Sequence, residues 1–230
     1  MLPESIRAEH ETEWRSWFGE YDEWAVYRPS QTERPGVALL LLRAGISRGF
    51  VKLRPEWDAR VEQLATSRLN EAETFTAPTV VGLHSSGGWT SLGLTALPGR
   101  IHSPRIPAPI RAIAEEASEL IRLAAPCPPG WRPMHGDFGP WNLRRMRGIG
   151  PVLFDWEHAA PAPPLADLVF YAAAAKAVGL SVQIESEFSD EAVAFWREEI
   201  PRRFGRDRRD DRLARSMLEV LGTSEPIPKC

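Results

Sequence analysis

Two short segments of the sequence carry side chains that bind hard cations and move protons. In the first, MHGDFGPWN, Asp137 follows a His-Gly pair and Asn142 comes five residues later. In the second, LFDWEHA, Asp155 follows a run of β-forming residues. Carboxylate and amide oxygens are the ligands that Mg²⁺ prefers, and a carboxylate in an irregular loop can project into a cleft and accept a proton. The two segments therefore predict a magnesium site beside a general base.

Phosphoryl transfer is the chemistry that this set of residues serves best. It needs a carboxylate that receives a hydroxyl proton, oxygen ligands for Mg²⁺, and a cation that contacts the nucleotide phosphates. Asp137 is the candidate for the base, and Asn142 and Asp155 are the candidate ligands. Lys52, in the β-forming segment GFVKLR, is the candidate cation. We expect Mg²⁺ and ATP, with GTP as the alternative nucleotide.

Other catalytic classes lack the residues that they need. The sequence has no G-x-S-x-G motif, so a serine hydrolase of that type is excluded. Gly148 to Gly150 is too short for a dinucleotide fingerprint and is typical of a hairpin turn. The five histidines have no HxH or HExxH spacing, which excludes the usual zinc hydrolase sites; they are His10, His84, His102, His135 and His158.

The sequence resembles the aminoglycoside phosphotransferase and choline kinase-like family, a branch of the protein-kinase-like fold. HGDFGPWN is similar to the HGDxxxxN catalytic loop of that family, and LFDWE is similar to its IDWE-type metal-binding motif, which takes the place of the kinase DFG. The likeness is close from Met134 to Leu168. Over the rest of the chain it concerns only the order of the elements.

The resemblance implies a role for each matching residue. Asp137 would be the catalytic base, and His135 would hold the catalytic loop in shape. Asn142 and Asp155 would be the magnesium ligands. Asp167, at the start of the LADLVFY segment, would support the catalytic loop.

The resemblance also assigns the nucleotide contacts. Lys52 lies on the third predicted strand, where the kinase pattern VAIK places the lysine that contacts the phosphates and pairs with a helix glutamate. Glu62 is the preferred partner, with Glu56 and Glu71 as alternatives. The base would lie at the connector between the lobes, against the backbone of Thr95, Ala96 and Leu97.

One part of the kinase pattern is missing from the sequence. Kinases place a Gly-rich turn between the first two strands so that backbone N–H groups approach the phosphates. Here that link reads PSQTERPG, in which Gly36 is the only glycine. Ser30, Gln31 or Thr32 are alternative donors.

The pattern of the elements changes near residue 100. Before it, β-forming segments separated by Gly, Pro and Ser predict strands, and the Gly- and Pro-free segment Glu56 to Phe75 predicts a helix. The predicted strands are Trp24 to Arg28, Val37 to Arg43, Phe50 to Leu53, Thr79 to Leu83 and Trp89 to Leu97. The pattern predicts a β-rich antiparallel lobe over residues 1–97. The resemblance implies a two-lobed, protein-kinase-like α+β fold in which this lobe binds the nucleotide.

After a Pro-rich connector the helical period dominates. Ile110 to Ile121 and Pro163 to Gly179 predict helices on either side of the catalytic loop, and Leu143 to Arg145 and Val152 to Phe154 are short strand candidates. We expect residues 98–230 to form a helical lobe that carries the catalytic loop and the metal site.

Composition and charge limit the kinds of partner that we expect for the chain. The chain has 230 residues, a net charge of −3 and a pI near 6.0, which give no global attraction to nucleic acid or to an anionic membrane. Two cysteines without a CxxC spacing favour a reducing compartment, and the charged N-terminal segment lacks the apolar core of a signal peptide. We expect a cytoplasmic monomer or homodimer.

The sequence thus predicts a phosphotransferase that acts on a hydroxyl group of a small molecule. Aminoglycosides, sugars, amino alcohols and precursors of surface polysaccharides all remain open as acceptors. The alternative is a pseudokinase, a catalytically inactive module that senses nucleotide or scaffolds a partner.

Overall fold

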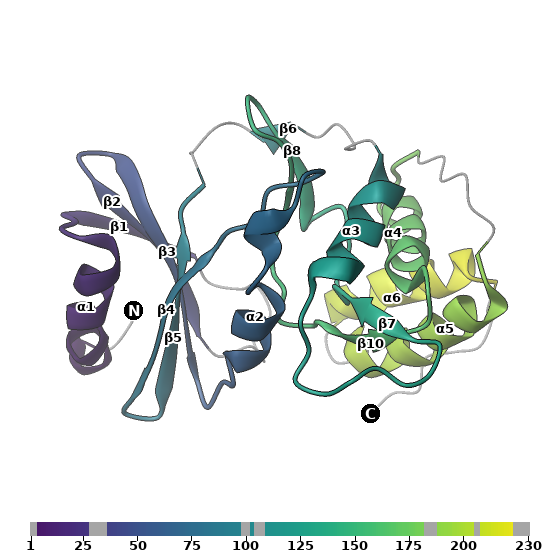
Figure 1. Ribbon diagram of the computed structural model, residues 1–230, viewed down its shortest axis with the longest axis horizontal. Coiled ribbons are helices and arrows are strands. Elements are labelled where there is room, and N and C mark those ends of the chain that lie inside the picture. The colour runs from purple at the N-terminus through teal and green to yellow at the C-terminus, as the bar shows by residue number, and fades with distance from the viewer. Residues whose placement is uncertain are drawn as a thin grey trace.

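The structure, a computed structural model, describes residues 4–27, 36–97, 102–103, 109–181, 188–204 and 208–222. An antiparallel sheet forms one part of the molecule, and most of the helices form the other (Figure 1). This confirms the α+β class. Residues 98–101 lie outside the described ranges, so the lobe boundary between residues 97 and 98 stays a prediction.

The five strands of the sheet follow the order β1-β2-β3-β5-β4, and all neighbours are antiparallel. The sequence predicted each strand, with differences of a few residues at the ends. Their bounds are β1 (Glu23–Tyr27), β2 (Val37–Arg43), β3 (Ile46–Pro55), β4 (Val80–Ser86) and β5 (Trp89–Thr95). The central β3 carries Lys52, whose Cα partners are Ala38 on β2 and Leu92 on β5.

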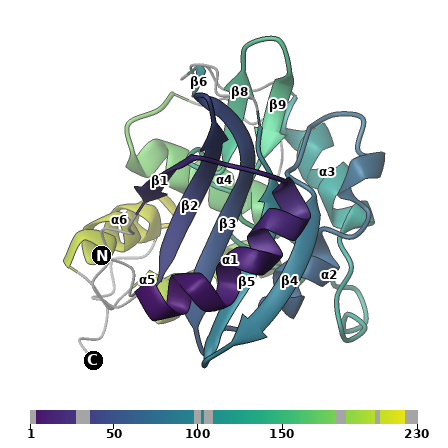
Figure 2. The ribbon, with the colours of Figure 1, turned by 90° about the vertical axis from the view of Figure 1, so that its left-hand side faces the viewer.

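Side chains alternate between the two faces of the sheet. On the outer face, Leu39 and Leu41 of β2 and Val51 and Leu53 of β3 are buried against Trp14 of helix α1 (Glu4–Phe18). Lys52 therefore points to the opposite face, towards the helical part. Helix α1, which crosses the outer face of the sheet in Figure 2, was not predicted from the sequence.

Three glycines let α1 approach the sheet closely. A Cβ atom at Gly82 or Gly93 would lie 2.2 or 2.5 Å from the indole of Trp17, and one at Gly49 would lie 2.4 Å from the ring of Phe18. These distances are too short for any side chain at the three positions. Trp17 and Phe18 of α1 therefore pack directly on the backbone of β3, β4 and β5.

The helix predicted over Glu56 to Phe75 is wrong in its extent. Helix α2 spans only Arg60–Ala65, and a 3₁₀ turn, η1 (Leu69–Glu71), follows it. The Thr66 hydroxyl donates to the carbonyl of Glu62 at 2.8 Å, and the Ser67 hydroxyl donates to that of Leu64 at 2.8 Å. Such side-chain bonds compete with the helical ladder and end the helix. Phe75 then packs into the core of the helical part.

The helical part is built around α4 (Ala166–Ala177), which is buried over most of its surface. The other helices pack around it or complete its core; they are α3 (Ile110–Leu120), α5 (Asp190–Phe204) and α6 (Arg208–Val220). The prediction of helices over Ile110 to Ile121 and Pro163 to Gly179 is confirmed. Among the described residues, no helix is both long enough and apolar enough to cross a membrane.

Short strands frame the two motifs. β7 (Arg132–Met134) pairs with β10 (Ala160–Ala162), and β8 (Leu143–Met146) pairs with β9 (Gly150–Leu153) and with β6 (His102–Ser103). The β8–β9 pair is the hairpin predicted around Gly148 to Gly150. The first motif lies in the loop between β7 and β8, and the second directly follows β9, so this framework brings both motifs to one place.

Candidate active site

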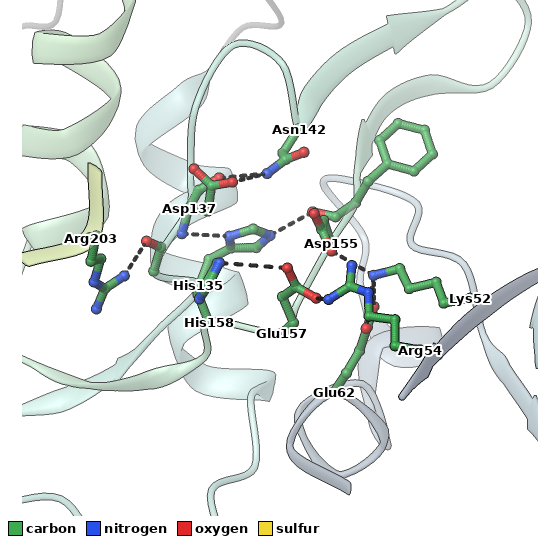
Figure 3. A network of polar contacts seen from close by, with 12 residues as sticks. Lys52, Arg54, Glu62, His135, Asp137, Asn142, Asp155, Glu157, His158 and Arg203 are labelled. Atoms are coloured by element: carbon green, nitrogen blue, oxygen red, sulfur yellow. Dashed lines mark hydrogen bonds and ion pairs between the residues drawn. The ribbon is translucent and has the colours of Figure 1, made fainter. Parts of the chain in front are cut away.

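The loop from β7 to β8 holds the carboxylate of Asp137 from two sides. Asn142 Nδ2 donates to the backbone oxygen of Asp137 at 2.9 Å and to its Oδ2 at 2.7 Å. Trp141 Nε1 lies 3.1 Å from each carboxylate oxygen. Because its NH₂ group is used in these bonds, the amide oxygen of Asn142 is turned away from Asp137, as Figure 3 shows. The structure thus brings the two predicted residues of this loop, Asp137 and Asn142, into direct contact.

His135 is fully buried and links the two motifs. Its Nδ1 accepts the backbone N–H of Asp137 at 3.1 Å, and its Nε2 donates to the carbonyl of Phe154 at 2.7 Å. The two contacts fix the neutral tautomer with the proton on Nε2. Burial lowers the pKa of the ring from 6.5 to about 4, so it stays neutral at physiological pH. The imidazole therefore holds the loop of the first motif against the residue before Asp155.

Asp167, from the first turn of α4, binds the backbone of the same loop. Its carboxylate accepts the N–H groups of His135 at 2.7 Å and Gly136 at 3.1 Å. Burial raises the pKa of this carboxyl to about 6, although the two backbone hydrogen bonds oppose that rise. On the other side, Arg203 of α5 donates to the carbonyl of Gly136 at 2.7 Å. The loop is thus fixed by contacts from two helices.

Lys52 connects the sheet to the second motif. Its Nζ lies 2.7 and 2.8 Å from the carboxylate oxygens of Glu62 and 2.5 Å from Oδ1 of Asp155. Burial alone would lower the pKa of the ammonium, but the charges of Glu62 and Asp155 outweigh burial and raise it. The alternative partner Glu71 pairs instead with Arg68. The structure therefore brings Lys52 together with Glu62, the preferred partner.

Asp155 is ionised and held in an uncommon backbone conformation. Burial opposes its ionisation, but Lys52 lowers the pKa of the carboxyl to about 2. Its φ of 64° lies in the left-handed region, which Asp tolerates better than most residues. Strained backbone of this kind gathers at functional sites.

A second ion pair, which the sequence did not predict, runs beside the first. Arg54 of β3 is paired with Glu157, whose side chain is only 7% exposed. Oxygen atoms of Glu62, Asp155 and Glu157 all lie within 4.8 Å of one another. The signal was the spacing: Arg54 and Glu157 each come two residues after a predicted site residue, in GFVKLR and in LFDWE.

A cavity of about 410 Å³ lies between the sheet and the second motif. Its lining includes the apolar Phe50, Leu94 and Met146 and the predicted connector residues Thr95, Ala96 and Leu97. Its charged lining residues are Lys52, Arg54, Glu62 and Asp155. Lys52 is paired with Leu92 on β5 and Gly49 with Thr95, so the connector lies further along the strands than the charged group. The volume falls within the range of ligand sites, and an apolar slot with a charged end suits a base joined to phosphates. Ser30, Gln31 and Thr32 lie outside the described residues.

One family model matches the greater part of the chain. A sequence model described as a phosphotransferase enzyme family matches residues 59–215. A sequence search of curated proteins found no match.

Solved structures of aminoglycoside phosphotransferases share the fold. The chain is similar to APH(4)-Ia, with 12% identity and a TM-score of 0.52 over 91% of this chain and 88% of that one. A thermostable mutant of APH(4)-Ia with ADP and hygromycin B has 14% identity and a TM-score of 0.50 over 92% and 88%. APH(3'')-Id from Streptomyces rimosus, with ADP and streptomycin, has 17% identity and a TM-score of 0.51 over 95% and 99%. The predicted protein-kinase-like fold is confirmed.

Proposed function

Because the chain belongs to the phosphotransferase enzyme family, we propose that it transfers the γ-phosphoryl group of ATP, or of GTP, to a hydroxyl group of a small molecule. One observation carries the proposal. Asn142 holds the carboxylate of Asp137, His135 joins that loop to the residue before Asp155, and Asp155 lies against Lys52 in the lining of the cavity. This is the full set that phosphoryl transfer requires.

The lining of the cavity supports a binding position for each part of the nucleotide. The base would lie in the apolar slot between Phe50 and Met146, with its edge against the backbone of Thr95 to Leu97. The phosphates would then extend towards Lys52. The ammonium of Lys52 is fixed between Glu62 and Asp155, so it is oriented before the nucleotide arrives and loses little freedom on binding.

The oxygen atoms near Asp155 fit Mg²⁺. The Asp155 carboxylate is ionised, and Glu157 adds a carboxylate within 4.8 Å of it. Asn142 binds Asp137 through its NH₂ group, and its amide oxygen points away from Asp137 and would be the third ligand. Oxygen ligands of this kind suit a hard cation. Bound there, Mg²⁺ would neutralise charge on the transferring phosphoryl group.

Asp137 is the proposed general base. Asn142 and Trp141 orient its carboxylate, while His135, Asp167 and Arg203 fix the backbone on which it stands. The carboxylate would accept the proton of the acceptor hydroxyl as the new O–P bond forms and the bond to the leaving nucleoside diphosphate breaks.

The acceptor class stays a proposal. Solved structures of the same fold contain hygromycin B or streptomycin, which supports an aminoglycoside; a sugar or an amino alcohol also fits the proposed reaction. The complete set of charged residues favours an active enzyme over the pseudokinase, because an inactive relative has no need of an oriented base.

The test compares turnover and nucleotide affinity in Asp137→Asn. Acceptors would be screened among aminoglycosides, sugars and amino alcohols with Mg²⁺ and ATP. We expect kcat to fall by about 10² to 10⁴-fold, because the amide cannot take the proton, while the Kd for ATP stays within about twofold. Asp211→Asn is the matched control, since Asp211 pairs with the exposed Arg215 on α6 and lies away from the motifs. Turnover within about threefold of wild type would contradict the role of Asp137.

Nucleotide binding tests the proposal without an acceptor. A ligand present at about 100 times its Kd stabilises the folded state by about 2.7 kcal/mol, which is a readable thermal shift. No shift with millimolar ATP, GTP or ADP in the presence of Mg²⁺ would overturn the proposed function.

A further inference from the structure

Building on the proposed function, we propose that Arg54 is a second cation for the nucleotide phosphates, and that Glu157 holds its guanidinium in position until the nucleotide binds. The proposal rests on two neighbouring ion pairs that join β3 to the second motif.

Lys52 and Arg54 lie two residues apart on β3, so their side chains leave the same face of the strand. Both line the cavity. Asp155 and Glu157 are also two residues apart, and each faces one of these cations. The result is two neighbouring ion pairs, Lys52 with Asp155 and Arg54 with Glu157, as Figure 3 shows.

The guanidinium of Arg54 is supported from a second direction. Its Cζ lies 4.8 Å from the centroid of the Trp57 ring, within the range of a cation–π contact. Arg54 also helps to lower the pKa of Asp155, which places its charge close to the proposed metal ligand. Phosphates bound near Asp155 would therefore lie within the field of Arg54.

The carboxyl groups around the cavity outnumber the basic side chains, so a second cation near the phosphates would help to bind them. Lys52 and Arg54 face Glu62, Asp155 and Glu157, so the cluster holds two basic side chains and three carboxyl groups. Lys52 is already shared between Glu62 and Asp155. Among the described residues that line the cavity, Arg54 is the other cation. The link between β1 and β2 has only Gly36, so backbone N–H groups of a Gly-rich turn are not in the sequence to grip the phosphates.

The chemistry of arginine suits an exchange of partners. Its planar N–H groups bind carboxylate and phosphate in the same forked geometry, so a phosphate can share or replace Glu157. A buried carboxylate that lost its cation would be costly. Glu157 would retain the metal ion at Asp155 as an alternative partner, because their oxygens lie within 4.8 Å.

The test measures the affinity for ATP, ADP and adenosine by calorimetry in the presence of Mg²⁺. In Arg54→Gln we expect ATP to bind about tenfold or more weakly, ADP to be affected less, and adenosine to stay within about twofold of wild type. Arg68→Gln is the matched control. It also removes an Arg–Glu ion pair in the same part of the chain, but Arg68 and Glu71 are exposed and lie outside the cavity. We expect wild-type affinities for this variant.

Arg54→Lys keeps the proposal testable if Arg54→Gln does not fold by circular dichroism. Lysine retains the charge and loses the fork, so we expect ATP binding about threefold or more weaker with adenosine unchanged. An equal loss for ATP and adenosine would overturn the proposal and make Arg54 a structural residue, and unchanged ATP affinity would overturn it as well. A wild-type protein that binds no nucleotide would refute the proposed function itself. This result can be told apart from both outcomes for Arg54, because they require a wild-type protein that binds ATP.

Discussion

Replacing His135 with glutamine should change how the free energy of unfolding depends on pH. The imidazole is buried between Asp137 and Phe154 and is neutral in the folded protein, since burial lowers its pKa from 6.5 to about 4. Glutamine has a donor and an acceptor but no titration in this range. The variant therefore removes one proton-binding group while retaining polar atoms for its two partners.

The magnitude follows from the pKa shift. Below pH 6.5 His135 is protonated in the unfolded chain, whereas in the folded protein it is protonated only below about pH 4. The contribution of His135 to stability is thus fully present above pH 6.5 and is lost as the pH falls through 4. At about 1.4 kcal/mol for each pH unit, the loss in the wild type is roughly 3 kcal/mol, and the glutamine variant does not suffer it.

Asp167→Asn should show the opposite dependence. Burial raises the pKa of Asp167 from 3.8 to about 6, so the folded protein binds a proton before the unfolded chain does. This contribution is present below pH 3.8 and is lost as the pH rises through 6, again roughly 3 kcal/mol. The contributions of His135 and Asp167 to the free energy of unfolding change over the same pH range with opposite sign, so they nearly cancel in the wild type. Each single variant removes one contribution, and the pH dependence of the other can then be measured.

The assay is urea unfolding followed by tryptophan fluorescence, which the nine tryptophans make sensitive. Free energies would be measured at about pH 7.5, 6, 5 and 4 for the wild type and both variants. The informative quantity is the difference between variant and wild type at each pH, because other titrating groups cancel in it. The glutamine variant is expected to be less stable at pH 7.5, since it loses the ring contact with Trp156. In the Asn variant at this pH, a backbone N–H of the loop loses its acceptor, and this cost opposes the gain from removing a buried charge. Differences that stay constant within about 0.5 kcal/mol from pH 7.5 to 4 would refute the reasoning.

Three further substitutions probe the site. Lys52→Ala should weaken ATP binding by about tenfold or more, because the phosphates lose a charged donor, whereas equal affinities by calorimetry would contradict the assignment. Asp155→Ala should abolish the Mg²⁺ dependence of nucleotide binding while circular dichroism shows a folded protein; retained dependence would remove Asp155 from the metal site. Gly136→Ala should abolish turnover and lower the melting temperature, because its φ is +82° and its Cβ would lie 2.1 Å from the carbonyl oxygen of His158; a wild-type melting temperature would be the contrary result.

The sequence located the parts of the site whose function depends on local spacing. Asp137 and Asn142 stand on one loop, and Asp155 ends the next hairpin, so three short strands are enough to bring them together. Lys52 could be assigned because the order of strands was readable from the turn residues between them. The prediction for Glu62 depended on the resemblance to kinases, since three glutamates near Lys52 were available in the sequence.

The missed features depend on contacts between distant segments. Arg54 and Glu157 are separated by 103 residues, and no local pattern shows that their side chains meet across a cleft. Helix α1 was missed for a related reason. Its buried side includes His10 and Trp14, which bond to Ser91 at 2.7 and 3.0 Å, so a polar contact with β5 takes the place of a clear apolar stripe. The predicted helix over Glu56 to Phe75 was too long because the sequence does not show that the hydroxyl groups of Thr66 and Ser67 bond to backbone carbonyls and end α2.

The seat of α1 on the glycine backbone of the sheet has a practical consequence for a screen of acceptors. The helix lies on one face of the sheet (Figures 1 and 2). Residues that line the cavity, such as Phe50 and Lys52, point to the other face, so the sheet separates the helix from the cavity. A biotin attached ahead of α1 would therefore tether the protein to a sensor chip with the cleft facing the flow. Hundreds of hydroxyl compounds could then pass over one immobilised sample with and without nucleotide, and only those that bind in the nucleotide's presence would go forward to a turnover assay.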